Sequence, residues 1–230
     1  DHPELADQTK DFREIALSRW SESAEPGNPA QNLQLANNGH APSMFAVAQN
    51  LLRHDKPAEA VSWFRRAADL GHVEAAYCFA ECRVLGKNIA PNPAEGLRYL
   101  KQAAQAGEPR AMDLLGVCYT RGLGTSIEYT QAVRWFRAAV AEGNLPAMYN
   151  LAARFAQGQG VIKNEARAAD LFRQGAERGN AVCMTTYAKC LEAGFGVSTD
   201  KEAAADWYRK GAAAGNAPAI AWCRQNNIQF

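Results

Sequence analysis

The sequence has no long apolar run, no dominant charge and few histidines. No stretch approaches the roughly 20 apolar residues that a membrane-spanning helix needs, so the sequence predicts no membrane span. Lys plus Arg total 25 and Asp plus Glu total 24, and the formal charge of +1 gives no overall attraction to nucleic acid or to an anionic membrane. Electrostatic recognition must therefore come from local patches.

The sequence also lacks a leader. It begins with Asp1 rather than Met, and no charged segment followed by an apolar one comes after it. We therefore expect a processed or trimmed product. A removed export signal accounts for such a start, so we expect a periplasmic or otherwise exported protein rather than a cytoplasmic one.

Residues that carry chemistry do not fall into recognisable spacings. The four histidines are spread along the chain, at His2, His40, His54 and His72. No Ser/His/Asp or Cys/His arrangement can be defended, and no carboxylate pair can be selected from spacing alone. The six cysteines show no paired C-x-x-C spacing of the kind that binds zinc. We therefore expect no enzyme activity, no metal and no cofactor.

What the sequence does contain is an internal repeat. Five glycines follow helical, Ala-rich stretches at a spacing of 36 residues: Gly71, Gly107, Gly143, Gly179 and Gly215. Gly39 precedes the first of them by only 32 residues, because the first unit has lost about four residues around the segment RHDKP, residues 53–57. Hydrophobic residues make up 47% of the chain, enough for a substantial core and too many for general disorder.

Each unit reads as two helices, which we call helix A and helix B. In the fourth unit, Asn144 can cap helix A and Pro146 suits its first turn. Apolar residues then recur at the amphipathic spacing over residues 147–157. Gly158 breaks the helix, and helix B resumes near Glu165.

Residues at equivalent positions explain how the units would pack. Small residues occupy one position in helix B (Ala60, Gly96, Ala132, Ala168, Ala204) and one in helix A (Ala48, Ala80, Gly116, Ala152, Ala188). Large residues occupy two adjacent positions in helix B (Trp63, Tyr99, Trp135, Leu171, Trp207 and Phe64, Leu100, Phe136, Phe172, Tyr208). No single hairpin can bury these faces, so neighbouring units must stack. The predicted fold is all-α, an α/α superhelix (solenoid) of helical hairpins.

Three segments carry a family resemblance: G-[NH]-x-x-A-M-x-x-L-[AG] at the start of helix A, the G-x-G loop, and A-V-x-W-F-R-x-A-A in helix B. They resemble Sel1-like repeats, relatives of the tetratricopeptide repeats, over roughly residues 36–226. We divide the chain into N-terminal capping helices (1–35), an array of about five repeats (36–215), and a C-terminal capping helix and tail (216–230). Residues 3–23 are expected to form an extra helix that caps the first unit.

Several repeated residues have competing interpretations. The G-x-G tripeptides follow a helix and recur at the repeat period, so we interpret them as hairpin turns rather than as phosphate loops. A column of cations, Arg65, Lys101, Arg137, Arg173 and Arg209, could attract an acidic partner. It could equally serve the end of helix B, where cations favour the helix dipole and cover the aromatic layer. All four methionines share one column and are expected in the core.

The cysteines have competing interpretations too. Cys82, Cys118 and Cys190 share a helix A column. Equivalent positions in stacked helices lie ~8–10 Å apart, whereas a disulfide needs Cα atoms within ~7 Å. Some Sel1-like proteins carry a regular disulfide between the two helices of each repeat, but helix B here has no cysteine. We therefore interpret the cysteines as small buried hydrophobic residues.

The resemblance implies a concave surface lined by one face of helix A. Residues on that face vary from unit to unit, and a position that packing does not dictate is free to contact a ligand. Aromatic and charged residues together favour interface hot spots. The predicted partner-binding residues are Phe45, Gln49, Arg53, Glu74, Tyr77, Glu81, Arg110, Asp113, Arg121, Tyr149, Gln157, Thr185 and Lys189.

The resemblance also implies a function, that of a non-catalytic solenoid that binds a protein. Some bacterial Sel1-like proteins are immunity proteins that neutralise toxic effectors, including secreted lipases. An immunity or inhibitor protein with such an effector as its partner is the most specific expectation. The first alternative is an adaptor or scaffold for envelope assembly or signalling. The alternative of another class is an enzyme or small-ligand binder, as claimed for cysteine-rich relatives.

Overall fold

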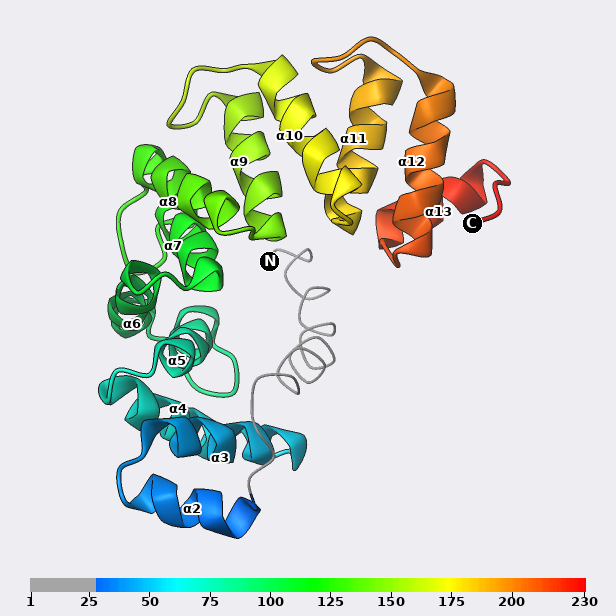
Figure 1. Ribbon diagram of the computed structural model, residues 1–230. Helices are drawn as coiled ribbons and strands as arrows, with labels where there is room; N and C mark the ends of the chain where they lie inside the picture. Colours follow the sequence, from blue (N-terminus) through cyan, green and yellow to red (C-terminus); the bar gives the residue numbers. More distant parts are fainter. Residues whose placement is uncertain (1–27) are drawn as a thin grey trace. The chain divides into compact units, whose positions relative to one another are not determined.

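A computed structural model describes residues 28–230 as short α-helices joined by tight loops, with no strand in this part of the chain (Figure 1). The predicted all-α class is therefore confirmed. The expected helix over residues 3–23 lies outside the described residues. The helices are α2 (Pro29–Asn37), α3 (Ala41–Arg53), α4 (Pro57–Asp69), α5 (Val73–Leu85), α6 (Pro93–Gln105), α7 (Pro109–Arg121), α8 (Tyr129–Ala141), α9 (Leu145–Gln157), α10 (Glu165–Glu177), α11 (Ala181–Ala193), α12 (Lys201–Ala213) and α13 (Ala217–Gln225).

The chain forms two compact units that divide between Ala103 and Ala104, within α6. In the first unit, α2 packs on α3, α3 on α4 and α4 on α5. In the second unit, every helix from α7 to α12 packs on the helix that follows it. Each unit is thus a stack of helical hairpins, with odd-numbered helices as helix A and even-numbered helices as helix B. The expected boundary between capping helices and repeats, at residues 35–36, falls inside α2.

The helix ends lie where the repeat pattern predicts them. Asn144 caps α9, because its Oδ1 accepts a hydrogen bond of 3.0 Å from the Ala147 amide. Gly158 ends the same helix in the left-handed conformation, with φ of 68°. Helix B of this unit begins at Glu165, as predicted. The same left-handed glycine ends α5, α7, α9 and α11. Ten successive helices, α3 to α12, all have 13 residues.

The first repeat has the short loop that its spacing predicts. Residues 86–92 separate α5 from α6, whereas only residues 54–56 separate α3 from α4, a difference of four residues. Asp55 makes this tighter turn with a φ of 60°. In the following loop, Asn88 has a φ of 65° where later repeats have the second glycine of G-x-G.

The second glycine of the G-x-G loop lies where neighbouring repeats approach each other closely. A Cβ built on Gly160 would overlap the backbone of Tyr129 at the start of α8. A Cβ on Gly196 would likewise overlap the carbonyl oxygen of Glu165 at the start of α10. Each of these loops therefore lies against the first turn of helix B in the preceding repeat. No side chain fits there, which explains the glycine better than the turn alone does.

The core follows the predicted columns in most respects. The inner large column is buried throughout: Phe64, Leu100, Phe136, Phe172 and Tyr208 are at most 4% exposed. The outer large column differs from the prediction, because Tyr99 is buried but its counterparts are half-buried. Cations cover two of them, with Arg66 4.1 Å from the ring centroid of Trp63 and Lys210 4.2 Å from that of Trp207.

Two arginines of the cation column form ion pairs within their own helices. Arg173 pairs with Asp170 at 2.6 Å and with Glu177 at 2.7 Å, both in α10. Arg209 pairs with Asp206 at 2.9 Å in α12. These contacts favour the helix-based interpretation of the column over an acidic-partner stripe.

The cysteines and methionines are core residues. All six cysteines are free and buried. Burial raises the pKa of Cys118 and Cys183 to about 12, so both thiols stay protonated and unreactive at neutral pH. Three of the four methionines are buried, and Met184 is half-buried. The interpretation of the cysteines as buried residues is confirmed, and that of the methionines is confirmed for all but Met184.

Candidate partner-binding site

In the first unit, most of the predicted site residues are engaged within the protein. Phe45 is buried and stacks on the ring of His72, with centroids 4.7 Å apart. Tyr77 is buried and donates a hydrogen bond of 3.1 Å to Glu81, which also pairs with Lys87 at 3.4 Å. These side chains already have partners, so the role predicted for them requires them to exchange those partners on binding.

The remaining predicted residues of this unit differ in exposure. Gln49 is buried, and its amide has no hydrogen-bond partner among the described residues. Glu74 is half-buried and lies close enough to His72 to influence its charge. Arg53 is exposed. The structure does not bring these three residues together with Phe45 and Tyr77 around one described hollow.

In the second unit, the predicted residues divide into engaged and exposed groups. Arg110 pairs with Glu108 at 2.7 Å, across the N-terminus of α7. Thr185 is buried and lies 2.9 Å from Asn216 Oδ1. Four of the predicted residues in this unit are exposed: Arg121, Tyr149, Gln157 and Lys189.

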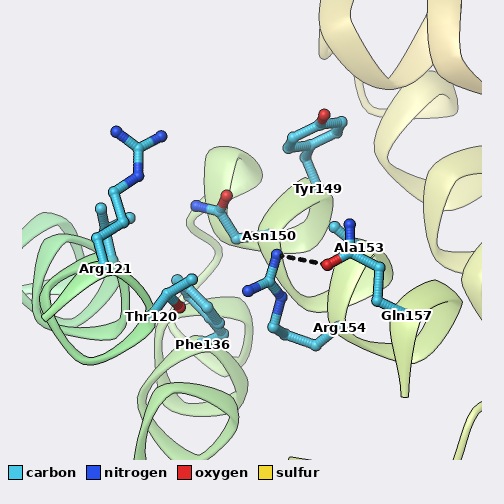
Figure 2. A pocket seen from close by; sticks show the side chains of 9 residues that line it. Thr120, Arg121, Phe136, Tyr149, Asn150, Ala153, Arg154 and Gln157 are labelled. Carbon is cyan, nitrogen blue, oxygen red and sulfur yellow. Dashed lines mark hydrogen bonds between the residues drawn. The ribbon is translucent and has the colours of Figure 1, made fainter. Parts of the chain in front are cut away.

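Three of these exposed residues line one hollow of about 190 Å³ (Figure 2). Three consecutive helices line it. Helices α7 and α9 lie side by side, and α8 lies beneath them. Its lining residues are Val117, Thr120, Arg121, Phe136, Tyr149, Asn150, Ala153, Arg154 and Gln157. The hollow is therefore a feature of helix A faces in neighbouring repeats, as the concave-surface prediction requires.

Arg154 is the most unusual residue of the hollow. It is half-buried, and its Nε is buried without a hydrogen-bond partner among the described residues. One of its terminal nitrogens donates a long hydrogen bond of 3.3 Å to Gln157 Oε1 (Figure 2). Burial lowers the pKa of Arg154, and the like charge of Arg121 lowers it further. The guanidinium still stays protonated at neutral pH, so a cation stands in the hollow without a counter-charge.

The sequence prediction missed Arg154, Asn150 and Thr120. A signal for Arg154 was present, because it occupies the column in which Cys82, Cys118 and Cys190 stand. A long cation in a column that small buried thiols occupy in α5, α7 and α11 departs from the packing pattern of that column. Nothing comparable distinguishes Thr120, whose hydroxyl donates to the Gly116 carbonyl at 2.9 Å.

Beside the hollow, α7 and α9 are joined by a hydrogen bond. Asn150 Nδ2 donates to Asp113 Oδ1 at 2.8 Å. Burial raises the pKa of Asp113 to about 6, and the Asn150 hydrogen bond opposes this only in part. Asp113 thus binds its proton more tightly in the folded chain than in the unfolded chain.

This difference in proton affinity makes stability depend on pH. The free energy of unfolding should fall as the pH rises from about 4 to about 6, because the folded state gives up the Asp113 proton at higher pH. We expect Asp113→Asn to be more stable than the wild type by roughly 2 kcal/mol at pH 7 and equally stable near pH 4. Urea unfolding at a series of pH values measures this. The prediction would be contradicted if the free energies of unfolding of the two proteins changed with pH in parallel.

Neither a metal-binding group nor a membrane span is found among the described residues. No group of three or more His, Cys, Asp or Glu side chains among residues 28–230 is arranged to hold a metal ion. Within the same residues, no helix is both long and apolar enough to cross a membrane. The hollow of about 190 Å³ is also smaller than the ~300–1,000 Å³ typical of small-molecule sites, and suits a single side chain of a larger partner.

Comparison with known proteins agrees with this architecture. The Sel1 repeat model matches residues 42–72, 74–108, 109–144, 145–180 and 181–216. Stacked Sel1 hairpins form protein-binding solenoids, so the fold and the hollow define a protein-interaction scaffold. The chain belongs to the Sel1 repeat family, which confirms the resemblance identified from the sequence. No curated protein matches the chain.

Solved structures share the fold. A Sel1 repeat protein from Oxalobacter formigenes superposes with a TM-score of 0.74 at 23% identity, over 85% of this chain and 86% of its own. A protective antigen of uropathogenic Escherichia coli with an SLR fold gives 0.75 at 22% identity, over 95% of this chain but 50% of its own. The immunity protein PA5088 from Pseudomonas aeruginosa gives 0.57 at 20% identity, over 90% and 83%. At these identities the likeness concerns the fold alone.

Proposed function

We propose that this protein is an immunity or inhibitor protein that binds a toxic effector protein, without catalysis, through the hollow between α7 and α9. The observation that carries the proposal is the hollow itself, in which an exposed aromatic ring stands beside two arginines that make no ion pair with any described residue. Tyrosine and arginine are the residues that most often dominate protein interfaces. The protein PA5088, which has the same fold, is an immunity protein, and this supports the choice of partner class.

The proposal is tested by capture of the partner. The protein is immobilised, exposed to an extract of its native source, and the retained proteins are identified by mass spectrometry. We expect a toxic effector in a stoichiometric complex, with its activity stopped when the two are mixed. Capture of two proteins that bind simultaneously, with no activity suppressed, would instead support the adaptor alternative and contradict the proposal. Export of the protein, favoured by the sequence, stays a prediction.

Tyr149 offers the sharpest single-residue test of the site. Its side chain is 36% exposed, and its ring leans on Phe172 with centroids 5.7 Å apart. We expect Tyr149→Ala to weaken binding of the captured partner by about 30-fold, as a hot spot worth about 2 kcal/mol would. Isothermal titration calorimetry measures the affinity, and circular dichroism checks that the fold is intact. Tyr77→Ala is a poor test, because Tyr77 is buried and bonded to Glu81.

A matched control is available outside the hollow. Ile162, in the loop between α9 and α10, is 91% exposed and does not line the hollow. Ile162→Ala should bind the partner as the wild type does. Equal affinities for Tyr149→Ala and Ile162→Ala would remove Tyr149 from the binding surface.

A further inference from the structure

The two arginines of the hollow, Arg121 and Arg154, differ from the arginines that form ion pairs elsewhere in the described structure. Arg83 lies in contact with the carboxylate of Glu95, and Arg173 and Arg209 pair with acids of their own helices. Arg121 and Arg154 form no ion pair with any residue between 28 and 230. The hollow therefore holds positive charge that the described part of the chain does not neutralise.

The neighbouring acid does not supply the missing charge. Asp113 Oδ1 accepts a hydrogen bond from Asn150, and Asp113 forms no ion pair with Arg121 or Arg154. The Thr120 hydroxyl donates within its own helix. The remaining polar group in contact with Arg154 is the neutral amide of Gln157. The hollow therefore offers donors and a net positive potential, and its complement is a group that accepts hydrogen bonds and carries negative charge.

The shape of the hollow limits what this group can be. Its volume of about 190 Å³ accommodates one side chain. Figure 2 shows the Arg154 guanidinium between Asn150 and Gln157, with Arg121 on the α7 side and Tyr149 farther along α9. A guanidinium binds a carboxylate through two parallel hydrogen bonds, a geometry that a neutral amide matches poorly. A ring that lines the hollow can pack on the aliphatic stem or the backbone of an entering residue.

We infer that this hollow receives the carboxylate of an aspartate or glutamate from the partner protein, held by Arg154 and steered by Arg121. The inference rests on the proposed protein-binding function and adds the chemistry of the partner's anchor residue. The partner surface that docks here is acidic, and its anchor side chain displaces the weak contact between Arg154 and Gln157. Because Arg121 is exposed, its contribution should depend strongly on salt, whereas that of the half-buried Arg154 should depend less.

The test uses random short peptides displayed on phage and the immobilised full-length protein. We expect the enriched peptides to share an aspartate or glutamate. A synthetic copy of the best peptide should bind the wild-type protein at least about tenfold more tightly than its Glu→Gln or Asp→Asn version. Arg154→Gln should reduce peptide binding by a similar factor. Peptides without an acidic residue, or no enrichment over a blank surface, would overturn the inference.

Matched variants separate charge in the hollow from charge in general. Arg121→Gln changes an exposed residue that the fold does not need, so it keeps the test available if Arg154→Gln fails to fold. Arg134→Gln removes an exposed arginine of α8 outside the hollow and should leave peptide affinity unchanged. Equal weakening by all three variants would overturn the inference, because it would indicate general attraction.

The same assay distinguishes a protein side chain from a small anion. Free glutamate or inorganic phosphate should displace the acidic peptide far less effectively than unlabelled peptide does. Displacement at equal concentrations would assign the hollow to a small anion and overturn the inference. Capture of a toxic effector whose binding ignores Arg154→Gln and Arg121→Gln would also overturn it, while leaving the proposed function in place.

Discussion

Gly196→Ala is expected to lower the free energy of unfolding by about 3 kcal/mol. Two effects add at this position. The backbone has a φ of 66°, which an L-residue with a side chain adopts only under strain. The new Cβ would also overlap the Glu165 carbonyl at the start of α10, and backbone cannot move aside as a flexible side chain can. Urea unfolding followed by circular dichroism measures the loss.

Gly179→Ala isolates the two effects. Gly179 also has a positive φ, of 94°, but a Cβ there would meet nothing within 4 Å. It should cost only the backbone strain, about 1 kcal/mol. Equal losses for the two variants would show that the loop does not press against the neighbouring repeat as described.

Phe136→Ala is expected to destabilise the protein by about 4 kcal/mol, since it removes a ring that is 1% exposed and leaves a cavity. Phe136 stands in the inner large column and also forms the floor of the hollow. The loss should appear in urea unfolding as a lower midpoint with an unchanged slope. A change below about 1 kcal/mol would mean that the site collapses around the smaller side chain.

The same ring explains a glycine in the middle of a helix. A Cβ on Gly116 would lie 2.5 Å from Phe136 Cε1, so Gly116→Ala alone should destabilise by about 2 kcal/mol through overpacking. In Phe136→Leu the space is larger, and the added methyl group should fit. The double variant Gly116→Ala/Phe136→Leu should therefore be more stable than the sum of the two single losses predicts. Additive losses would exclude direct contact as the reason for this glycine.

The helices and loops could be predicted from the sequence because each boundary depends on local chemistry. A capping Asn144, a left-handed Gly158 and a 36-residue period place helix ends without knowledge of the fold. The same period located the short first loop. The half-buried state of Trp63 and Trp207 could not be predicted this way, because it depends on which neighbouring cations cover the outer edge of each repeat.

The binding surface was harder to predict, since its face can be deduced from the repeat but the burial of each side chain cannot. Phe45 and Tyr149 occupy the same column, yet Phe45 stacks on His72 whereas Tyr149 is exposed. The difference is set by the residues around each position, which vary between repeats. Arg154, the exception in the cysteine column, was the better indicator of the site. Burial of a charged side chain costs free energy, so an arginine at a packing position indicates a role other than packing.

The loop after α3 and the helix before α3, which is α2, are each four residues shorter than their counterparts in the later repeats. The loops at Gly160 and Gly196 each rest on the first turn of the helix B before them. Helix α2 begins four residues later than a 13-residue helix with the same end would. The first repeat lacks the same number of loop residues. Lengthening this array by gene duplication or by design should therefore work between two interior repeats, where a full-length loop can contact the first turn of the preceding helix B. A unit inserted directly ahead of α3 would instead meet the shortened loop after α3, which lacks the residues for this contact.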